Sequence, residues 1–169
     1  MVKASSAGTY KLQQVALQGE ADGDLETVVH ALAEDVQRVL GIDLVTVWQL
    51  APDLGEMTCI SSFDVEGKRK LEGAVLARAD LPGYFSCILE NQTISAYDVH
   101  SHSDLAELIE PYFKPNGVKS LLDYVIFDGI QPKAVICCET TKQNRDWTDS
   151  DVEEIRKLTV LSSSLIAWH

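Results

Sequence analysis

Apolar residues recur at steps of three and four along two long stretches of the chain, which is the pattern of a helix that packs one face against a core. The first stretch covers residues 25–40, with Asp24 before it as a helix-capping residue and Gly41 after it as a helix terminator. The second stretch follows Thr148 and continues to the end of the chain. Asp151, three residues after Thr148, completes the signature of a capping box. We therefore predict a long helix near each end of the chain.

The N-terminal part is expected to differ from the rest of the chain. We expect residues 1–8 to form a disordered tail and residues 9–19 to form a short helix with a few apolar positions. We therefore divide the chain into an N-terminal tail with a short helix, 1–23, and one domain, 24–169. A domain of that length is ordinary and can bury a substantial core.

Between the two long helices the hydrophobic period changes to two, which is typical of β-strands. The expected strands cover 42–50, 57–63, 71–77, 93–97, 118–127 and 133–139. Turn-forming residues join the first two strands and the last two strands as hairpins. A short helix is expected over 81–90, and another begins at Asp104 and is bounded by Pro111.

Strands joined by hairpins favour an antiparallel sheet. We therefore predict an α+β fold with a central antiparallel sheet of five to six strands. The terminal helices cover one face of the sheet, and the middle segment forms a lid of helices and loops over the other face. A lid of this kind commonly encloses a cavity that binds a small molecule.

The charge of the chain narrows the expected partners. Fourteen Lys and Arg stand against twenty-six Asp and Glu, which gives a net charge of −12. Because affinity for nucleic acid comes mostly from cations that neutralise phosphates, we expect no nucleic-acid partner. The basic cluster at 68–70 is interpreted as a solvated turn. No apolar run approaches the roughly 18 residues of a membrane span, so we expect no membrane partner.

The four cysteines stand at positions 59, 87, 137 and 138. No Cys-x-x-Cys or His-Glu-x-x-His motif occurs, so we expect no metal site. The first ten residues lack the apolar core of a signal peptide, which favours free thiols in the reducing cytoplasm. Redox or metal chemistry is the less favoured alternative.

Several sequence motifs are similar to those of one known family. Residues 117–126 read GVKSLLDYVI, residues 134–139 read AVICCE, and residues 145–151 contain Arg-Asp-Trp-Thr followed by Asp. Residues 85–98 add a helix, a strand and an Asp in the same order. By these motifs and their spacing, the chain from about 25 to 167 resembles a GAF domain, a small-molecule-sensing module of signalling proteins.

The resemblance implies a regulatory sensor of a bacterial signal-transduction protein, of the histidine kinase (two-component) or diguanylate cyclase type. Such a module binds a ligand between sheet and lid and passes the signal through its terminal helices to an output domain or a partner copy. We therefore expect a homodimer through these helices and an output domain outside this chain. The apolar stripe that continues to His169 suggests a piece of a longer receptor. The alternatives are an enzyme such as a free-methionine-sulfoxide reductase, or a non-binding dimerisation module.

Two further expectations follow from family motifs that this chain does not match. Bilin-binding relatives carry a Cys, usually followed by His, before the strand that begins near Ser120. Residues 108–117 contain neither, so we expect no covalent bilin and leave the ligand unidentified. The cysteine pattern of the reductases is also unmatched, so we expect no enzyme activity and no catalytic residue. The cyclic-nucleotide signature is only partly matched.

The resemblance also places the ligand-binding face on the last two strands. Leu121 and Asp123 share one face of their strand, and Cys137 and Glu139 share one face of the next. A longer loop between these strands puts all four on the cavity side. A two-residue turn instead pairs Asp123 with the opposite face. We favour the longer loop, because Pro132 is a poor residue for a strand ladder.

Buried carboxylates must be paired, hydrogen-bonded or protonated. We therefore expect Asp123 and Glu139 to offer acceptors to a cationic or hydrogen-bond-donating ligand. The alternative is that both are solvated at strand ends or cap backbone amides. Aromatic walls for the cavity can come from the middle segment, where ordinary core packing is the alternative. The aromatic candidates there are Tyr84, Phe85, Tyr97, Tyr112 and Phe113, and Asp98 is a polar candidate in the same segment.

Overall fold

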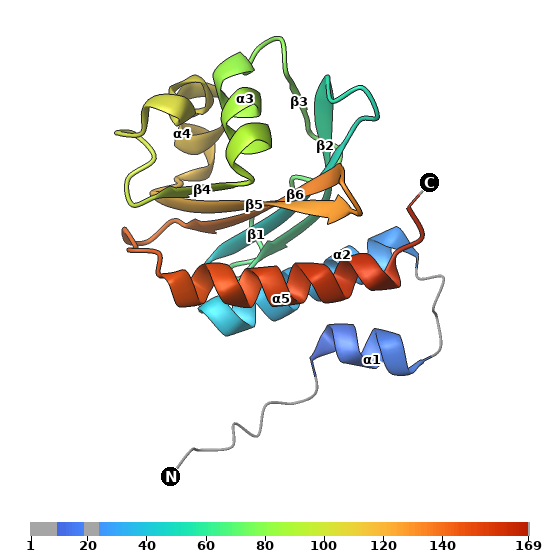
Figure 1. Ribbon diagram of the computed structural model, residues 1–169. Helices are drawn as coiled ribbons and strands as arrows, with labels where there is room; N and C mark the ends of the chain where they lie inside the picture. Colours follow the sequence, from blue (N-terminus) through green and yellow to red (C-terminus); the bar gives the residue numbers. More distant parts are fainter. Residues whose placement is uncertain (1–9, 19–23, 169) are drawn as a thin grey trace.

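The computed structural model describes residues 10–18 and 24–168 and has three layers (Figure 1). A sheet lies in the middle. Helices α2 (Leu25–Leu40) and α5 (Asp149–Leu165) cover one face of it. Helices α3 (Pro82–Asn91) and α4 (Lys114–Asn116) lie on the opposite face and belong to the lid. The tail expected over residues 1–8 falls outside the described residues.

The sheet has six strands, and every neighbouring pair is antiparallel. The strands are β1 (Leu44–Leu50), β2 (Glu56–Asp64), β3 (Val75–Ala77), β4 (Thr93–Ala96), β5 (Ser120–Asp128) and β6 (Gln131–Thr140). Their spatial order is β3-β2-β1-β6-β5-β4, so β6 and β1 lie at the centre. This confirms the α+β fold and the two-sided covering of the sheet. The short edge strand expected within 71–77 is β3.

The two long helices begin as the sequence predicts. Asp24 precedes α2, where its carboxylate accepts from the Thr27 hydroxyl at 3.1 Å, and Gly41 ends the helix with a φ of 63°. A positive φ costs glycine little, which explains the stop. At α5, the Thr148 hydroxyl accepts from the Asp151 amide at 3.1 Å, and the Asp151 carboxylate accepts from the Thr148 amide at 3.0 Å. The predicted capping box is therefore confirmed.

Helix α5 stops at Leu165, although the sequence predicts a helix to the chain end. Ile166 is already extended, with φ −96° and ψ 132°. Three consecutive serines explain the stop. Ser162 and Ser164 donate to main-chain carbonyls three residues earlier, and Ser163 donates to the Phe127 carbonyl of β5 at 2.6 Å. Such bonds compete with helix continuation.

Helix α1 (Lys11–Leu17) lies within the predicted short helix and is bound to α2 by a buried carboxylate. Asp35 of α2 is fully buried and accepts from the main-chain amides of Lys11 and Leu12 at 2.9 and 3.0 Å. These amides belong to the first turn of α1, where a helix has no internal acceptor for them. Leu12 and Val15 join the core beneath α2.

The lid continues from α3 through β4 into irregular helix. A 3₁₀ helix, η1 (Ser103–Leu108), leads into one π-helical turn, η2 (Ile109–Phe113), and then into α4. Pro111 lies inside η2, so the expectation that it bounds the helix is wrong. Proline is tolerated there because the amide it lacks falls in the first turn of a new helical segment. Single π-helical turns are frequent at functional sites.

The hairpin of β5 and β6 determines which residues face the lid. Asp123 pairs with Cys137 and Leu121 with Glu139, as expected for the cavity side. The reason for the expected register is nevertheless wrong. The turn is tight, with Asp128 opposite Gln131, and a bulge between Ile126 and Phe127 shifts the register by one residue. One extra residue in one strand reverses the faces beyond it, which restores the parity.

Candidate functional site

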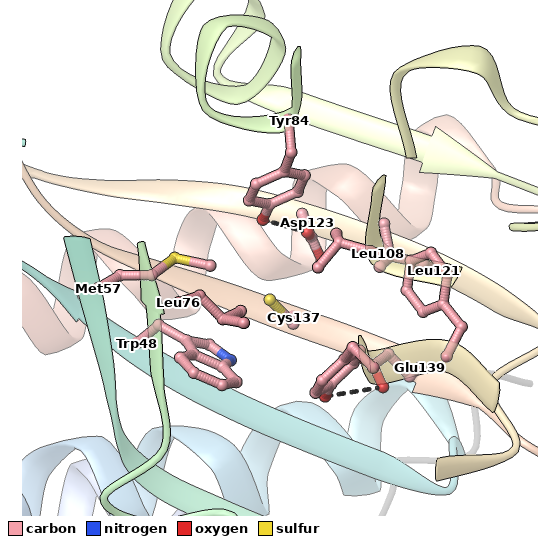
Figure 2. Close-up of a pocket in the computed structure, with 11 residues that line it drawn as sticks. Trp48, Met57, Leu76, Tyr84, Leu108, Leu121, Asp123, Cys137 and Glu139 are labelled. Atoms are coloured by element: carbon pink, nitrogen blue, oxygen red, sulfur yellow. Dashed lines mark hydrogen bonds between the residues drawn. The ribbon is translucent and has the colours of Figure 1, made fainter. Parts of the chain in front are cut away.

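A pocket lies between the sheet and the lid, and its walls come from eight elements (Figure 2). The sheet contributes Trp48 of β1, Met57 of β2, Leu76 of β3, Leu121 and Asp123 of β5, and Cys137 and Glu139 of β6. The lid contributes Tyr84 of α3, Leu108 of η1, and Tyr112 and Phe113 of η2. The walls are therefore apolar and aromatic, apart from two carboxyl groups, two phenol hydroxyls and one thiol.

The structure brings together seven of the ten residues that the sequence proposes for the site. These are Leu121, Asp123, Cys137, Glu139, Tyr84, Tyr112 and Phe113, and their role in ligand binding stays a prediction. Phe85 does not line the pocket, because it is fully buried in the core beneath the lid. Tyr97 lies after β4 with 55% of its surface exposed. Asp98 caps a local turn, where it accepts from His100 and Ser101.

Four wall residues were not among those that the sequence proposes for the site. They are Trp48, Met57, Leu76 and Leu108. Trp48 is buried in the core and also faces the pocket. The alternation along β1 could have identified Trp48 as a wall residue. Thr46 pairs with Cys137 of β6, and Trp48 lies two residues after Thr46 on the same face of β1.

Each lid tyrosine bonds to one carboxyl group of the sheet. The Tyr84 hydroxyl donates to Asp123 Oδ2 at 2.6 Å (Figure 2). The Tyr112 hydroxyl donates to Glu139 Oε1 and Oε2 at 3.0 and 3.2 Å. The two tyrosines lie on different lid segments, so these bonds hold the lid to the sheet at two points. All four side chains are buried.

Burial controls the protonation of both carboxyl groups. It raises the pKa of Asp123 to about 7, although hydrogen bonds from Tyr84 and Cys137 act in the opposite direction. It also raises the pKa of Glu139 well above its usual value, and the nearby charge of Asp123 adds to the shift. Hydrogen bonds from Tyr112 and the charge of Arg69 lower it only in part. Two carboxyl groups in one apolar pocket favour their neutral forms.

The cysteines are poorly suited to nucleophilic chemistry. Burial raises the pKa of all four thiols, that of Cys59 to about 12. Because the thiolate is the reactive form, these thiols are weak nucleophiles.

Within residues 10–18 and 24–168, no cluster of three or more His, Cys, Asp or Glu could hold a metal ion. In the same residues, no helix combines the length and the apolar character needed to cross a membrane.

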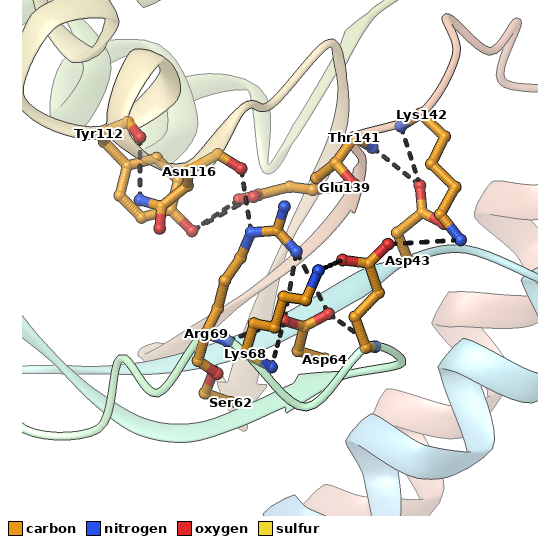
Figure 3. Close-up of polar contacts among 11 residues, drawn as sticks. Asp43, Ser62, Asp64, Lys68, Arg69, Tyr112, Asn116, Glu139, Thr141 and Lys142 are labelled. Atoms are coloured by element: carbon orange, nitrogen blue, oxygen red, sulfur yellow. Dashed lines mark hydrogen bonds and ion pairs between the residues drawn. The ribbon is translucent and has the colours of Figure 1, made fainter.

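Arg69 connects the β2–β3 segment to the lid beside Glu139 (Figure 3). Its guanidinium donates to the Asn116 carbonyl at 3.0 Å and pairs with Asp64 at 3.2 Å. Asn116 in turn donates to the main-chain carbonyl of Tyr112 at 2.9 Å. The interpretation of residues 68–70 as a solvated turn is therefore wrong for Arg69, whose side chain is only 20% exposed. Arg69 instead holds the end of the segment that carries Tyr112.

The space that remains between these side chains is small. A water-sized sphere can occupy about 10 Å³ of it, which is about the minimum for a single water molecule. The expectation of a lid over the sheet is confirmed, but the expectation that the lid leaves room for a guest is wrong, since only this small space remains. A larger ligand requires Leu76, Met57 or the lid to move.

Solved structures share this fold over about nine-tenths of the chain. A methyl-accepting chemotaxis protein, residues 122 to 287, matches with a TM-score of 0.74 and 20% identity, over 91% of this chain and 93% of that one. The phycocyanobilin-bound GAF domain from a cyanobacterial phytochrome matches with a TM-score of 0.72 and 20% identity, over 90% and 89%. A far-red absorbing dark-state structure with bound biliverdin IXa matches with a TM-score of 0.71 and 18% identity, over 91% and 96%. At these identities the likeness shows the fold.

The bilin-bound structures correct one expectation from the sequence. We expected no covalent bilin, because residues 108–117 contain neither Cys nor His. Neighbours with bound phycocyanobilin and biliverdin contradict this exclusion, since they have the fold of this chain. One missing motif is too narrow a basis for excluding a chromophore from a fold that accommodates it.

The family itself is shown by sequence. No curated protein matches the chain. The model of the GAF domain family, however, matches residues 24–163, which is most of the chain. The match covers the sheet, both long helices except the last residues of α5, and the whole lid. The chain therefore belongs to the GAF domain family.

Proposed function

We propose that this GAF domain is a sensory module that binds a small molecule in the pocket between the sheet and the lid. The observation that carries the proposal is the pair of buried carboxyl groups, each bonded to a tyrosine from a different lid segment. A molecule that enters this pocket must contact both the sheet and the lid. Its binding therefore changes how firmly the lid is held, which is what a sensor requires.

The proposed signal leaves through the terminal helices. Helices α2 and α5 pack on the face of the sheet opposite the pocket, and the side chains of β5 and β6 alternate between the two faces. A shift of these strands therefore reaches both layers. The output domain that receives the signal is proposed to be a histidine kinase or a diguanylate cyclase. The protein is proposed to act in a bacterial cytoplasm. The GAF domain itself is proposed to have no catalytic activity. The weakly nucleophilic thiols support the last point.

We also propose that two copies associate through the terminal helices. Leu17 of α1 and Val160 of α5 expose 82% and 59% of their surface on the side away from the pocket. Burial of such side chains in a second copy is favourable. Light scattering on the purified chain should give the mass of two copies, and Val160→Arg should reduce it to one. A wild-type mass of one copy would contradict the dimer.

A thermal-shift screen tests ligand binding. The panel contains amino acids, primary amines, dicarboxylates, nucleotides, phycocyanobilin and biliverdin. A ligand at 100 times its Kd stabilises the folded state by about 2.7 kcal/mol, which raises the melting temperature by several degrees in a domain of this size. We expect at least one class to do so.

Two variants of β3 show whether a stabilising molecule occupies the pocket. Leu76 lines the pocket, whereas its neighbour Val75 does not and is 52% exposed. Leu76→Trp should block the site and abolish the thermal shift, and Val75→Trp should leave it unchanged. A shift that survives Leu76→Trp, or a panel without any stabilising molecule, would overturn the proposal. The second outcome would favour a non-binding dimerisation module, the candidate that the small pocket volume supports.

A further inference from the structure

The two oxygen atoms of the Asp123 carboxyl group have different surroundings. Oδ2 accepts the Tyr84 hydroxyl at 2.6 Å. Oδ1 is buried and, among the described residues, has no hydrogen-bond partner. The neighbouring Cys137 thiol, which lowers the pKa of Asp123 as a hydrogen-bond donor, is only a weak donor and leaves Oδ1 unsatisfied. Asp123 is 1% exposed and lines the pocket, so Oδ1 is a polar atom without a partner inside an apolar cavity. An unpartnered buried oxygen is costly, which indicates a site that a ligand completes.

The charges around Asp123 indicate the kind of ligand. The titratable groups that face it are Tyr84 from α3, Cys137 and Glu139 from β6, and Tyr112 from η2. None of these carries a positive charge. Arg69 acts on Glu139, not on Asp123, and is already paired with Asp64. Asp123 is therefore the carboxyl group of the pocket that lacks a positive partner among the described residues.

The apolar walls also suit a cation. Trp48 and Tyr112 lie edge to face with ring centroids 6.0 Å apart, and both line the pocket. Aromatic faces attract cations, more strongly when water is excluded. The net charge of −12 draws cations toward the chain as a whole.

We propose that the ligand of this pocket carries a protonated amine that binds Asp123 Oδ1, and that its binding ionises this carboxyl group and releases one proton. The inference rests on the proposed function. Oδ2 accepts from Tyr84, so the proton of the neutral acid resides on Oδ1. On binding, this O–H bond breaks, the proton passes to the solvent, and an ammonium N–H takes its place as a charge-assisted bond.

Ionisation of Asp123 also strengthens the attachment of the lid. The Tyr84 hydroxyl then donates to a carboxylate instead of a neutral acid, and bonds to charged groups are about twice as strong. The ligand therefore holds α3 more firmly against β5. In this way, the same proton release that accompanies binding stabilises the closed lid.

The test compares n-butylamine with n-butanol and butyrate, which have the same chain length but are neutral and anionic. Titration calorimetry is carried out on the full chain at pH 6 and pH 8, in buffers that differ in ionisation enthalpy. The pKa of Asp123 is about 7, whereas an alkylamine stays protonated at both pH values. We expect about 0.9 protons released at pH 6, about 0.1 at pH 8, and about tenfold weaker binding at pH 6.

Matched variants assign the effect to one residue. Asp123→Asn should abolish n-butylamine binding, and Asp128→Asn, an exposed position on the same strand, should leave it unchanged. Loss of binding in Glu139→Gln but not in Asp123→Asn would overturn the assignment. A different result would be that n-butylamine does not bind, while n-butanol, butyrate or a bilin binds and Leu76→Trp abolishes that binding. This result would overturn the inference and leave the proposed function standing. Failure of every probe, the panel of the thermal-shift screen included, would overturn the proposed function as well.

Discussion

Replacing Asp123 with asparagine should raise the free energy of unfolding at pH 8 by about 2–4 kcal/mol. The pKa of Asp123 rises from 3.8 to about 7 because the group is buried, so the folded wild type must ionise a carboxyl group in an apolar pocket at pH 8. A shift of about three units corresponds to at most about 4 kcal/mol. Asparagine has nearly the same shape, carries no charge and still accepts the Tyr84 hydroxyl through its carbonyl oxygen.

The pH dependence has a definite direction. Between about pH 4 and pH 7 the folded state retains the proton of Asp123 and the unfolded state has lost it, so this group contributes less stability as the pH rises. The difference between Asp123→Asn and wild type should therefore be small at pH 4, grow up to pH 7 and stay constant above it. Urea unfolding at a series of pH values measures it, with Asp128→Asn as the control. A difference that is independent of pH would contradict the buried, protonated state of Asp123.

Phe85→Ala should lower the free energy of unfolding by about 3–5 kcal/mol, while Tyr97→Ala should change it by less than about 0.5 kcal/mol. Phe85 is fully buried and packs edge to face on Tyr84, with ring centroids 6.0 Å apart. Its removal leaves a cavity between α3 and the sheet. Tyr97 is exposed and contributes its main-chain carbonyl to Ser120 and Asn144, which alanine preserves.

Urea unfolding of the two variants also tests the correction of the sequence-based site. Both aromatic residues were expected to line the ligand cavity. If both are instead pocket walls, their replacement should have comparable and moderate effects on stability. Equal losses for Phe85→Ala and Tyr97→Ala would contradict the placement of Phe85 in the core and Tyr97 on the surface.

Elements that are defined by local signals could be predicted from the sequence. The stripe over α2, the Gly41 stop and the capping box at Thr148 depend on neighbouring residues along the chain. The end of α5 could not be predicted from periodicity, because it depends on serine side chains, one of which bonds to the distant Phe127 carbonyl. Arg69 is a similar case, since its partner Asn116 is remote in sequence.

The site, like the fold, has features that local sequence signals predict and features that depend on distant parts of the chain. The alternation along β5 and β6 shows which residues share a face within each strand. That Asp123, Cys137 and Glu139 face the same side was expected from the family resemblance and a longer loop, whereas a bulge that a period of two does not reveal produces this register. On α3, Tyr84 and Phe85 are adjacent aromatic residues that point in different directions around the helix axis. Whether a side chain reaches the pocket or the core therefore depends on how the lid lies on the sheet, which the chain pattern does not specify.

The most direct test of ligand binding beneath the lid is a crystal structure of the chain with the molecule that stabilises it most in the thermal-shift screen. The expected result is electron density for that molecule between Trp48 and Asp123, with a ligand nitrogen within about 3.2 Å of Asp123 Oδ1 and the side chain of Leu76 displaced. Density elsewhere on the molecule, with the pocket still closed by its own side chains, would contradict the account.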